Sequence, residues 1–138
     1  MNRGTVVLDS WPLLAFFEDQ PAALAVERLL VEANREGRRL LLSVVNAGEI
    51  WYCTARRCSR VEADAVIAEV AALGIAVVPV EWGAARAAAG FKARFPIAYA
   101  DCFAAALALE NRAPLATGDP EMRVLTSDID ILWMGDHC

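Results

Sequence analysis

The chain has 138 residues, of which 57% are hydrophobic and 22% charged, and its formal net charge is −5 at pH 7. A length near the commonest domain size predicts one domain over residues 1–138, and the acidic balance argues against binding of nucleic acid through general basicity. No apolar stretch reaches the 18 residues or so of a membrane-spanning helix, and Asp9 interrupts the run that a signal peptide would need. We therefore expect a cytoplasmic protein that does not contact the membrane.

The hydrophobic pattern predicts strands that alternate with helices along the chain. In chain order, strands are expected at 5–9, 39–45, 75–80 and 130–134, with a further short strand and a glycine turn within 113–119. Helices are expected at 11–18, 21–37, 46–58, 59–74, 81–95 and 97–112. Ser10, Asn46 and Ser59 are expected to cap the helices that follow them. Strands separated by helices form a mainly parallel sheet that is covered on both faces, so we expect a three-layer α/β/α sandwich.

The cysteines form no CxxC pair, and His137 is the only histidine. We therefore expect neither a zinc site nor hydrolysis through a histidine that activates a serine or cysteine. Cys102 lies in a predicted apolar helix, where a buried, reduced thiol acts as a small hydrophobic side chain. Any hydrolytic activity would need a different chemistry.

Four acidic residues stand where a strand ends or a helix begins. Asp9 and Asp119 each follow a predicted strand, whereas Glu49 and Asp101 lie near the starts of predicted helices. Each alone has an ordinary explanation as a cap, a turn residue or a partner of the helix dipole. Because ligands of parallel sheets gather beyond the carboxyl ends of the strands, we expect the four side chains to face one crevice.

Carboxylates that converge repel one another unless a cation compensates their charge. Oxygen ligands without histidine or cysteine favour Mg²⁺ or Mn²⁺, which keep several bound waters and often hold a substrate phosphate as well. Such an ion lowers the pKa of a bound water and stabilises charge on a leaving oxygen. The pattern therefore indicates hydrolysis of phosphodiester bonds without a protein nucleophile.

Four segments resemble the motifs of PIN-domain proteins, in particular the bacterial VapC-type toxins. These segments are "VVLDSWPLLAFFE", "SVVNAGEIWY", "YADCFAAALALE" and "LATGDPEMR…ILWM", which together extend from Val6 to Trp133. The resemblance implies a PIN-like fold and an endoribonuclease that depends on one or two Mg²⁺ or Mn²⁺ ions. It also implies an RNA substrate, a cognate antitoxin that neutralises the toxin, and a homodimer.

The resemblance also assigns roles to individual residues. The acidic quartet of the family corresponds to Asp9, Glu49, Asp101 and Asp119. The first three would bind the principal metal ion directly or through water, and Asp119 would support a second ion or the water shell.

Three further polar residues lie within the resembling motifs. Thr117 matches a small hydroxyl residue two positions before the last acid, and Ser10 follows the first acid; both are expected to orient the carboxylates. Asn46 stands where relatives usually carry Thr or Ser. We expect Asn46 to cap its helix and to donate a hydrogen bond to a carboxylate.

Arg56, Arg57 and Arg60 follow Glu49 by two to three helical turns and are expected to hold RNA phosphates at the rim of the site. The alternative is a solvated helix face or a docking surface for an acidic partner. Trp11 and Trp51 are expected in the core, with an antitoxin groove or base stacking as the alternative.

The alanine-rich helix at 81–95 would allow two helices to approach closely in a dimer, although packing within one chain explains its composition equally well. Two other functions compete with the ribonuclease. One is a PIN-like scaffold that binds RNA or protein but no longer cuts. The other is a Mg²⁺-dependent phosphoryl-transfer or receiver-type domain, against which "LDSW" lacks a DxD motif and Lys92 lies in a helix.

Overall fold

The structure, a computed structural model, describes residues 4–135, so the predictions for His137 and Cys138 lie outside the described residues. The strands are β1 (Val6–Leu8), β2 (Leu40–Ser43), β3 (Ile75–Val78), β4 (Leu115–Thr117) and β5 (Ile131–Trp133). The helices are α1 (Ser10–Phe17), α2 (Ala23–Glu36), α3 (Val44–Arg57), α4 (Arg60–Ala72), α5 (Trp82–Arg94), α6 (Tyr99–Asn111) and the 3₁₀ helix η1 (Pro120–Leu125). Within this part of the chain, no helix is both long and apolar enough to cross a membrane.

The five strands form one sheet in the order β3-β2-β1-β4-β5, and every neighbouring pair is parallel. In the register of the sheet, Val7 of β1 pairs with Leu41 of β2 on one side and with Leu115 of β4 on the other. Parallel neighbours need long connections, and helices supply them here. The central position of β1 brings its carboxyl end between those of β2 and β4.

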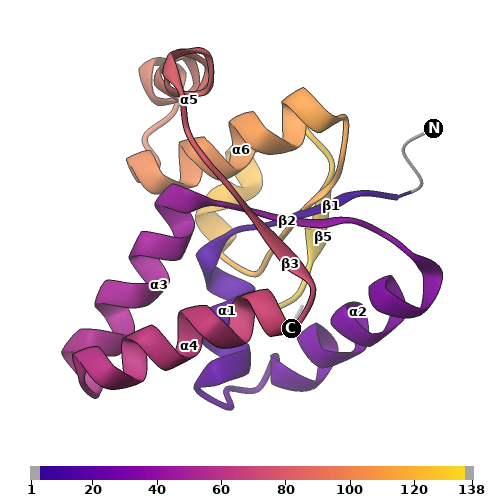
Figure 1. The fold of residues 1–138 in the computed structure, drawn as a ribbon. Helices are drawn as coiled ribbons and strands as arrows, with labels where there is room; N and C mark the ends of the chain where they lie inside the picture. The colour runs from indigo at the N-terminus through magenta and orange to yellow at the C-terminus, as the bar shows by residue number, and fades with distance from the viewer. Residues whose placement is uncertain (1–3, 136–138) are drawn as a thin grey trace.

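Helices cover both faces of the sheet, as predicted. In Figure 1, α5 and α6 lie above the sheet, and α1 to α4 lie below it. Side chains alternate between the two faces: Val7 packs with residues of α5 and α6, whereas Val6 and Leu8 pack on the side of α1 to α4. Cys102 is fully buried on the α6 side, in agreement with its predicted role as an apolar side chain. The three-layer α/β/α sandwich is confirmed.

The start of α3 differs from the prediction. The strand was expected to continue to Val45, but β2 ends at Ser43 and the helix begins at Val44. The hydroxyl of Ser43 accepts a hydrogen bond from the N–H of Val45 at 3.2 Å, which makes Ser43 the N-cap. The prediction that Asn46 caps this helix is therefore wrong, and Asn46 lies inside the helix.

Two other caps show how local hydrogen bonds set the helix starts. Asp9, and not Ser10, is the N-cap of α1, because its carboxylate accepts a hydrogen bond from the N–H of Trp11. Ser59 caps α4 as predicted, with its hydroxyl accepting from the N–H of Glu62 at 3.0 Å. η1 was not predicted, since a short 3₁₀ helix has no apolar periodicity of its own.

Candidate active site

Asp9 lies at the carboxyl-terminal edge of the sheet, directly after β1. The residue is 1% exposed, and its Oδ1 accepts the Trp11 hydrogen bond at 2.9 Å. Burial raises the pKa of the Asp9 carboxyl well above its usual value, a hydrogen bond with Thr117 lowers it, and the negative charges of Asp101 and Glu49 raise it. Asp9 therefore lies within electrostatic reach of three other residues of the predicted site.

Glu49 is half-buried in the second turn of α3. Its Oε1 accepts a hydrogen bond of 2.6 Å from the hydroxyl of Ser10. This short bond joins the start of α1 to α3 and fixes the direction of the Glu49 carboxylate. Ser10 thus contacts the predicted site through Glu49, although it is not the cap that was expected.

Asp101 lies in the first turn of α6 and is 7% exposed. Burial raises its pKa, and the nearby carboxylates of Asp119, Glu49 and Glu121 raise it further, to about 7. The dipole of α6 favours the charged form of an acid at this position. Burial and like charges therefore outweigh the helix dipole at Asp101.

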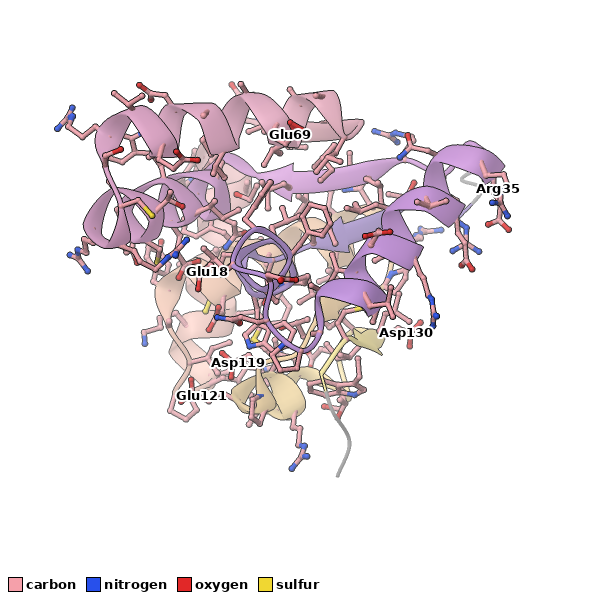
Figure 2. All side chains as sticks on the ribbon, turned by 90° about the horizontal axis from the view of Figure 1, so that it is seen from below. Glu18, Arg35, Glu69, Asp119, Glu121 and Asp130 are labelled. Atoms are coloured by element: carbon pink, nitrogen blue, oxygen red, sulfur yellow. The ribbon has the colours of Figure 1, made fainter. Side chains whose placement is uncertain are left out.

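Asp119 follows β4 and is the N-cap of η1. Its Oδ1 accepts a hydrogen bond from the N–H of Glu121 at 2.9 Å, and its own N–H donates to the Thr117 hydroxyl at 3.2 Å. Thr117 is fully buried at the end of β4. Its hydroxyl contacts both Asp9 and Asp119. Figure 2 shows Asp119 and Glu121 together at the start of η1. Glu121 was not among the predicted residues, and its signal in the sequence is its position in the first turn after Asp119.

Asn46 joins α3 to the start of α6. Its Nδ2 donates to the backbone carbonyl of Ala100 at 3.1 Å, one residue before Asp101. The residue is fully buried, and its Oδ1 is a buried acceptor without a hydrogen-bond partner. The Asn46 N–H therefore donates to a backbone carbonyl, whereas the sequence predicted a carboxylate as its acceptor.

The three predicted RNA-binding arginines are all exposed but differ in their contacts. Arg57 forms an ion pair of 3.4 Å with Glu18 at the end of α1. Arg56 lies over the ring of Tyr52, 5.0 Å from its centre. Arg60 lies on α4, on the far side of the α3–α4 turn. The three side chains therefore have different partners, and their binding of RNA stays a prediction.

The two tryptophans near the site have structural partners. The indole N–H of Trp51 donates to Asp64 of α4 at 2.9 Å, and Arg60 lies 5.2 Å from the centre of its ring. Trp11 packs against the core on the α1 side, and its ring covers Gly118 so closely that a Cβ there would overlap it. These contacts explain both indoles as packing residues, and a role in binding a base or an antitoxin stays a prediction.

The four predicted acids at the carboxyl-terminal edge of the sheet bear on the binding of a metal ion. Within residues 4–135, no three His, Cys, Asp or Glu side chains lie close enough to hold an ion by themselves. The carboxylates of Asp9, Glu49, Asp101 and Asp119 nevertheless offer only oxygen ligands. Burial raises the pKa values of Asp9 and Asp101, the neighbouring negative charges raise them further, and the Asn46 Oδ1 is a buried acceptor without a hydrogen-bond partner. Such a set fits a hard cation that keeps part of its water shell.

Comparison with known structures supports the assignment of the fold. VapC20 of Mycobacterium tuberculosis, described as a sarcin-ricin loop cleaving toxin, is 15% identical with a TM-score of 0.73, covering 93% of this chain and 98% of that chain. DNA-bound VapBC of Salmonella typhimurium is 16% identical with a TM-score of 0.74, covering 96% and 99%. VapBC2 of Rickettsia felis, bound to a fragment of promoter DNA, is 10% identical with a TM-score of 0.74, covering 93% and 97%.

At these identities the structural similarity shows the fold alone. No protein with a curated description matches the sequence significantly. The sequence itself matches the profile of the PIN domain over residues 6–127, which includes all four predicted acidic residues. The chain therefore belongs to the PIN domain family, and its structural neighbours are VapC toxins.

Proposed function

We propose that this chain is an endoribonuclease of the VapC toxin type that depends on Mg²⁺ or Mn²⁺. One observation carries the proposal: Asp9, Glu49, Asp101 and Asp119 are electrostatically coupled at one edge of the sheet, where burial and like charges raise the pKa values of Asp9 and Asp101. Acids that repel one another oppose folding, the more so where they are buried as Asp9 and Asp101 are, and a bound cation removes the repulsion. A protein that only bound RNA would have no use for this arrangement.

The chain's own residues hold and orient the site. Asp9, Glu49 and Asp101 would bind one or two ions, directly or through water, and a bound ion would activate a water for attack on the phosphate. Ser10 orients Glu49 through its 2.6 Å hydrogen bond. Asn46 fixes the first turn of α6 through Ala100.

The buried hydroxyl of Thr117 orients the second half of the site. It hydrogen-bonds to Asp9 and accepts from the N–H of Asp119. Asp119 would support a second ion or the water shell. Because its Oδ1 already accepts from Glu121, the other carboxylate oxygen is the one available to a cation.

The toxin role rests on the kind of protein to which the fold is similar. Two neighbours are described as toxin–antitoxin proteins: a toxin–antitoxin complex of Klebsiella pneumoniae, and VapBC-5 of Mycobacterium tuberculosis, a member of the VapBC family of toxin–antitoxin systems. We infer that this chain likewise has a cognate antitoxin, forms a homodimer, and cuts RNA in the cytoplasm, where that substrate is found.

The test is cleavage of a mixed pool of structured RNAs with Mg²⁺ or Mn²⁺. We expect the wild type to cleave and a chelator to stop it. Asp9→Asn and Asp101→Asn should each lower the rate by more than about a hundredfold, since even the loss of a residue that supports a metal ligand costs about ten- to a hundredfold.

The matched control is Asp128→Asn. It makes the same change of charge at a partly exposed carboxylate that pairs with Arg94 at 2.7 Å, and it should cleave like the wild type. Equal cleavage by the wild type and both site variants would overturn the mechanism. An inactive wild type that still bound RNA would favour the PIN-like scaffold.

A further inference from the structure

Helix α3 presents two consecutive aromatic residues that each carry an arginine over the ring, but the two pairs differ in their surroundings. Trp51 is held against α4, because its indole N–H donates to Asp64 and Arg60, the first residue of α4, lies over its ring. Tyr52 and Arg56 have no such contact with α4 among the described hydrogen bonds, and Tyr52 is 43% exposed. The second pair is therefore open to a ligand.

The Tyr52–Arg56 pair lies beside the carboxylates. Residues 49, 52 and 56 are three and four positions apart, which places Glu49, Tyr52 and Arg56 on one face of α3. Burial raises the pKa of the Tyr52 phenol, the negative charges of Glu49 and Asp101 raise it as well, and Arg56 lowers it. The phenol is therefore within electrostatic reach of two of the four acids.

Arg56 is also the arginine that is free to bind an anion at this rim. Arg57 is paired with Glu18, and Arg60 is stacked on Trp51. Within residues 4–135, Arg56 forms no ion pair, and its guanidinium contacts only the Tyr52 ring among the interactions described above. An acidic site in a chain of net charge −5 repels RNA, so a cation beside it favours the approach of a phosphate.

We propose that Tyr52 and Arg56 form a binding platform for one nucleotide of single-stranded RNA next to the carboxylates. The base stacks on the exposed part of the Tyr52 ring, and the Arg56 guanidinium binds the adjacent phosphate through its planar fork. Together they position the next phosphodiester at the acidic edge. This inference rests on the proposed function and adds to it two residues that hold a nucleotide of the substrate.

The strand must be single, because a base stacks on a protein side chain only after it has left its neighbours in a duplex. The platform carries no hydrogen-bond pattern that reads one base, so it should accept any base. A fully paired helix should therefore bind the platform much more weakly than an unpaired strand.

The test measures binding without cleavage. The Asp101→Asn protein is mixed, in Mg²⁺, with a short single-stranded RNA that contains 2-aminopurine, whose fluorescence falls when the base stacks on an aromatic ring. We expect quenching on binding. Tyr52→Leu should lose the quenching and weaken binding by about tenfold, while Tyr52→Phe should keep both, since stacking needs the ring and not the hydroxyl.

Arg56→Gln changes an exposed side chain, so we expect the fold to be kept, and it provides an independent readout. Its affinity should fall, and the slope of log Kd against log salt concentration should decrease by about 0.7, the value for one lost phosphate contact on a single strand. Two controls make the same kinds of change elsewhere. Arg35→Gln changes an arginine of α2 that lies far from Asp119 and Glu121 in Figure 2. Trp82→Leu removes an aromatic side chain that is 74% exposed. Both should bind like the parent.

The outcomes separate the platform from the proposed activity. Unchanged affinity and quenching in Tyr52→Leu, together with an unchanged salt slope in Arg56→Gln, would overturn the platform even if the wild type cleaves RNA. Binding that depends on both residues in a protein that never cleaves would support the platform and overturn the ribonuclease. Absence of RNA binding by the parent and the wild type alike would overturn both.

Discussion

On the two faces of the sheet, the buried side chains are almost all apolar, whereas at its carboxyl-terminal edge Asp9, Ser43, Asn46 and Thr117 are each no more than 3% exposed. The faces gain stability from the removal of apolar surface from water. The edge contains buried acids with raised pKa values and an amide oxygen without a partner, both of which oppose folding. A protein keeps such costly groups at one edge when a ligand needs them, so substitutions in the two regions should have opposite effects on stability.

The largest change in stability is expected for a substitution on a face of the sheet. Leu42→Ala removes a fully buried side chain of β2 that packs on the α1 to α4 side. We expect the free energy of unfolding to fall by about 2–5 kcal/mol, since a cavity remains. Urea denaturation measures the change. The cleavage rate of the remaining folded protein should stay near that of the wild type, and a loss of activity beyond the loss of folded protein would contradict the separation of face and edge.

A smaller destabilisation is expected where the two regions meet. Gly118→Ala places a methyl group against the Trp11 ring, next to Thr117 and Asp119. Overpacking of this kind lowers the free energy of unfolding by about 1–3 kcal/mol. In the double variant with Trp11→Leu, the two effects should be less than additive because the smaller side chain leaves room. Strict additivity in urea denaturation would show that the ring and the methyl group do not compete for space.

At the edge, a substitution should stabilise the protein. The pKa of Asp101 is about 7 in the folded state, above its ordinary value. Between about pH 4 and pH 7 the folded state therefore keeps a proton that the unfolded state releases. The free-energy cost of an ionised Asp101 in the folded state is absent below about pH 4, grows with rising pH, and is complete above about pH 7. Asp101→Asn should raise the free energy of unfolding of the metal-free protein by about 1–2 kcal/mol at pH 8.

This gain should shrink as the pH falls toward 4, which thermal or urea denaturation across the pH range can follow. Addition of Mg²⁺ at pH 8 should stabilise the wild type more than the variant. A gain that is independent of pH would mean that the carboxyl group, in either protonation state, is simply a poorer packing residue than the amide.

The smallest change in stability is expected outside both the faces and the carboxyl-terminal edge of the sheet. Trp51→Phe removes the exposed hydrogen bond to Asp64 but keeps an aromatic ring under Arg60. The free energy of unfolding should fall by about 0.5–1.5 kcal/mol, the usual net value of one hydrogen bond. RNA cleavage should not change. A fall in RNA affinity would instead place Trp51 with Tyr52 in substrate binding.

The sequence is sufficient to predict the architecture because apolar runs and helix signals alternate through the whole chain. The gathering of Asp9, Glu49, Asp101 and Asp119 follows from the same logic, since each stands near the end of a strand or the start of a helix and parallel strands share one carboxyl edge. The caps were predicted less well. Asp9 caps α1 in place of Ser10 because its carboxylate reaches the N–H of Trp11, a choice that depends on local geometry.

Contacts between helices were beyond prediction from spacing alone. Arg56, Arg57 and Arg60 are close in sequence, but Arg57 forms an ion pair with Glu18 at the end of α1, and Arg60 lies over the ring of Trp51. These directions are decided by how α1 and α4 pack on α3. The same holds for the bond of Asn46 to Ala100, which lies 54 residues further along the chain.

The order of the strands in the sheet determines when the site can form during synthesis of the chain. β1, which ends directly before Asp9, is synthesised before the other four strands of the sheet, yet its neighbour on one side is β4, which begins at Leu115. A chain that is still growing on the ribosome therefore cannot place Asp9 beside Thr117 and Asp119. If the protein cuts RNA as proposed, its unfinished copies are harmless to the ribosome and the message that produce them.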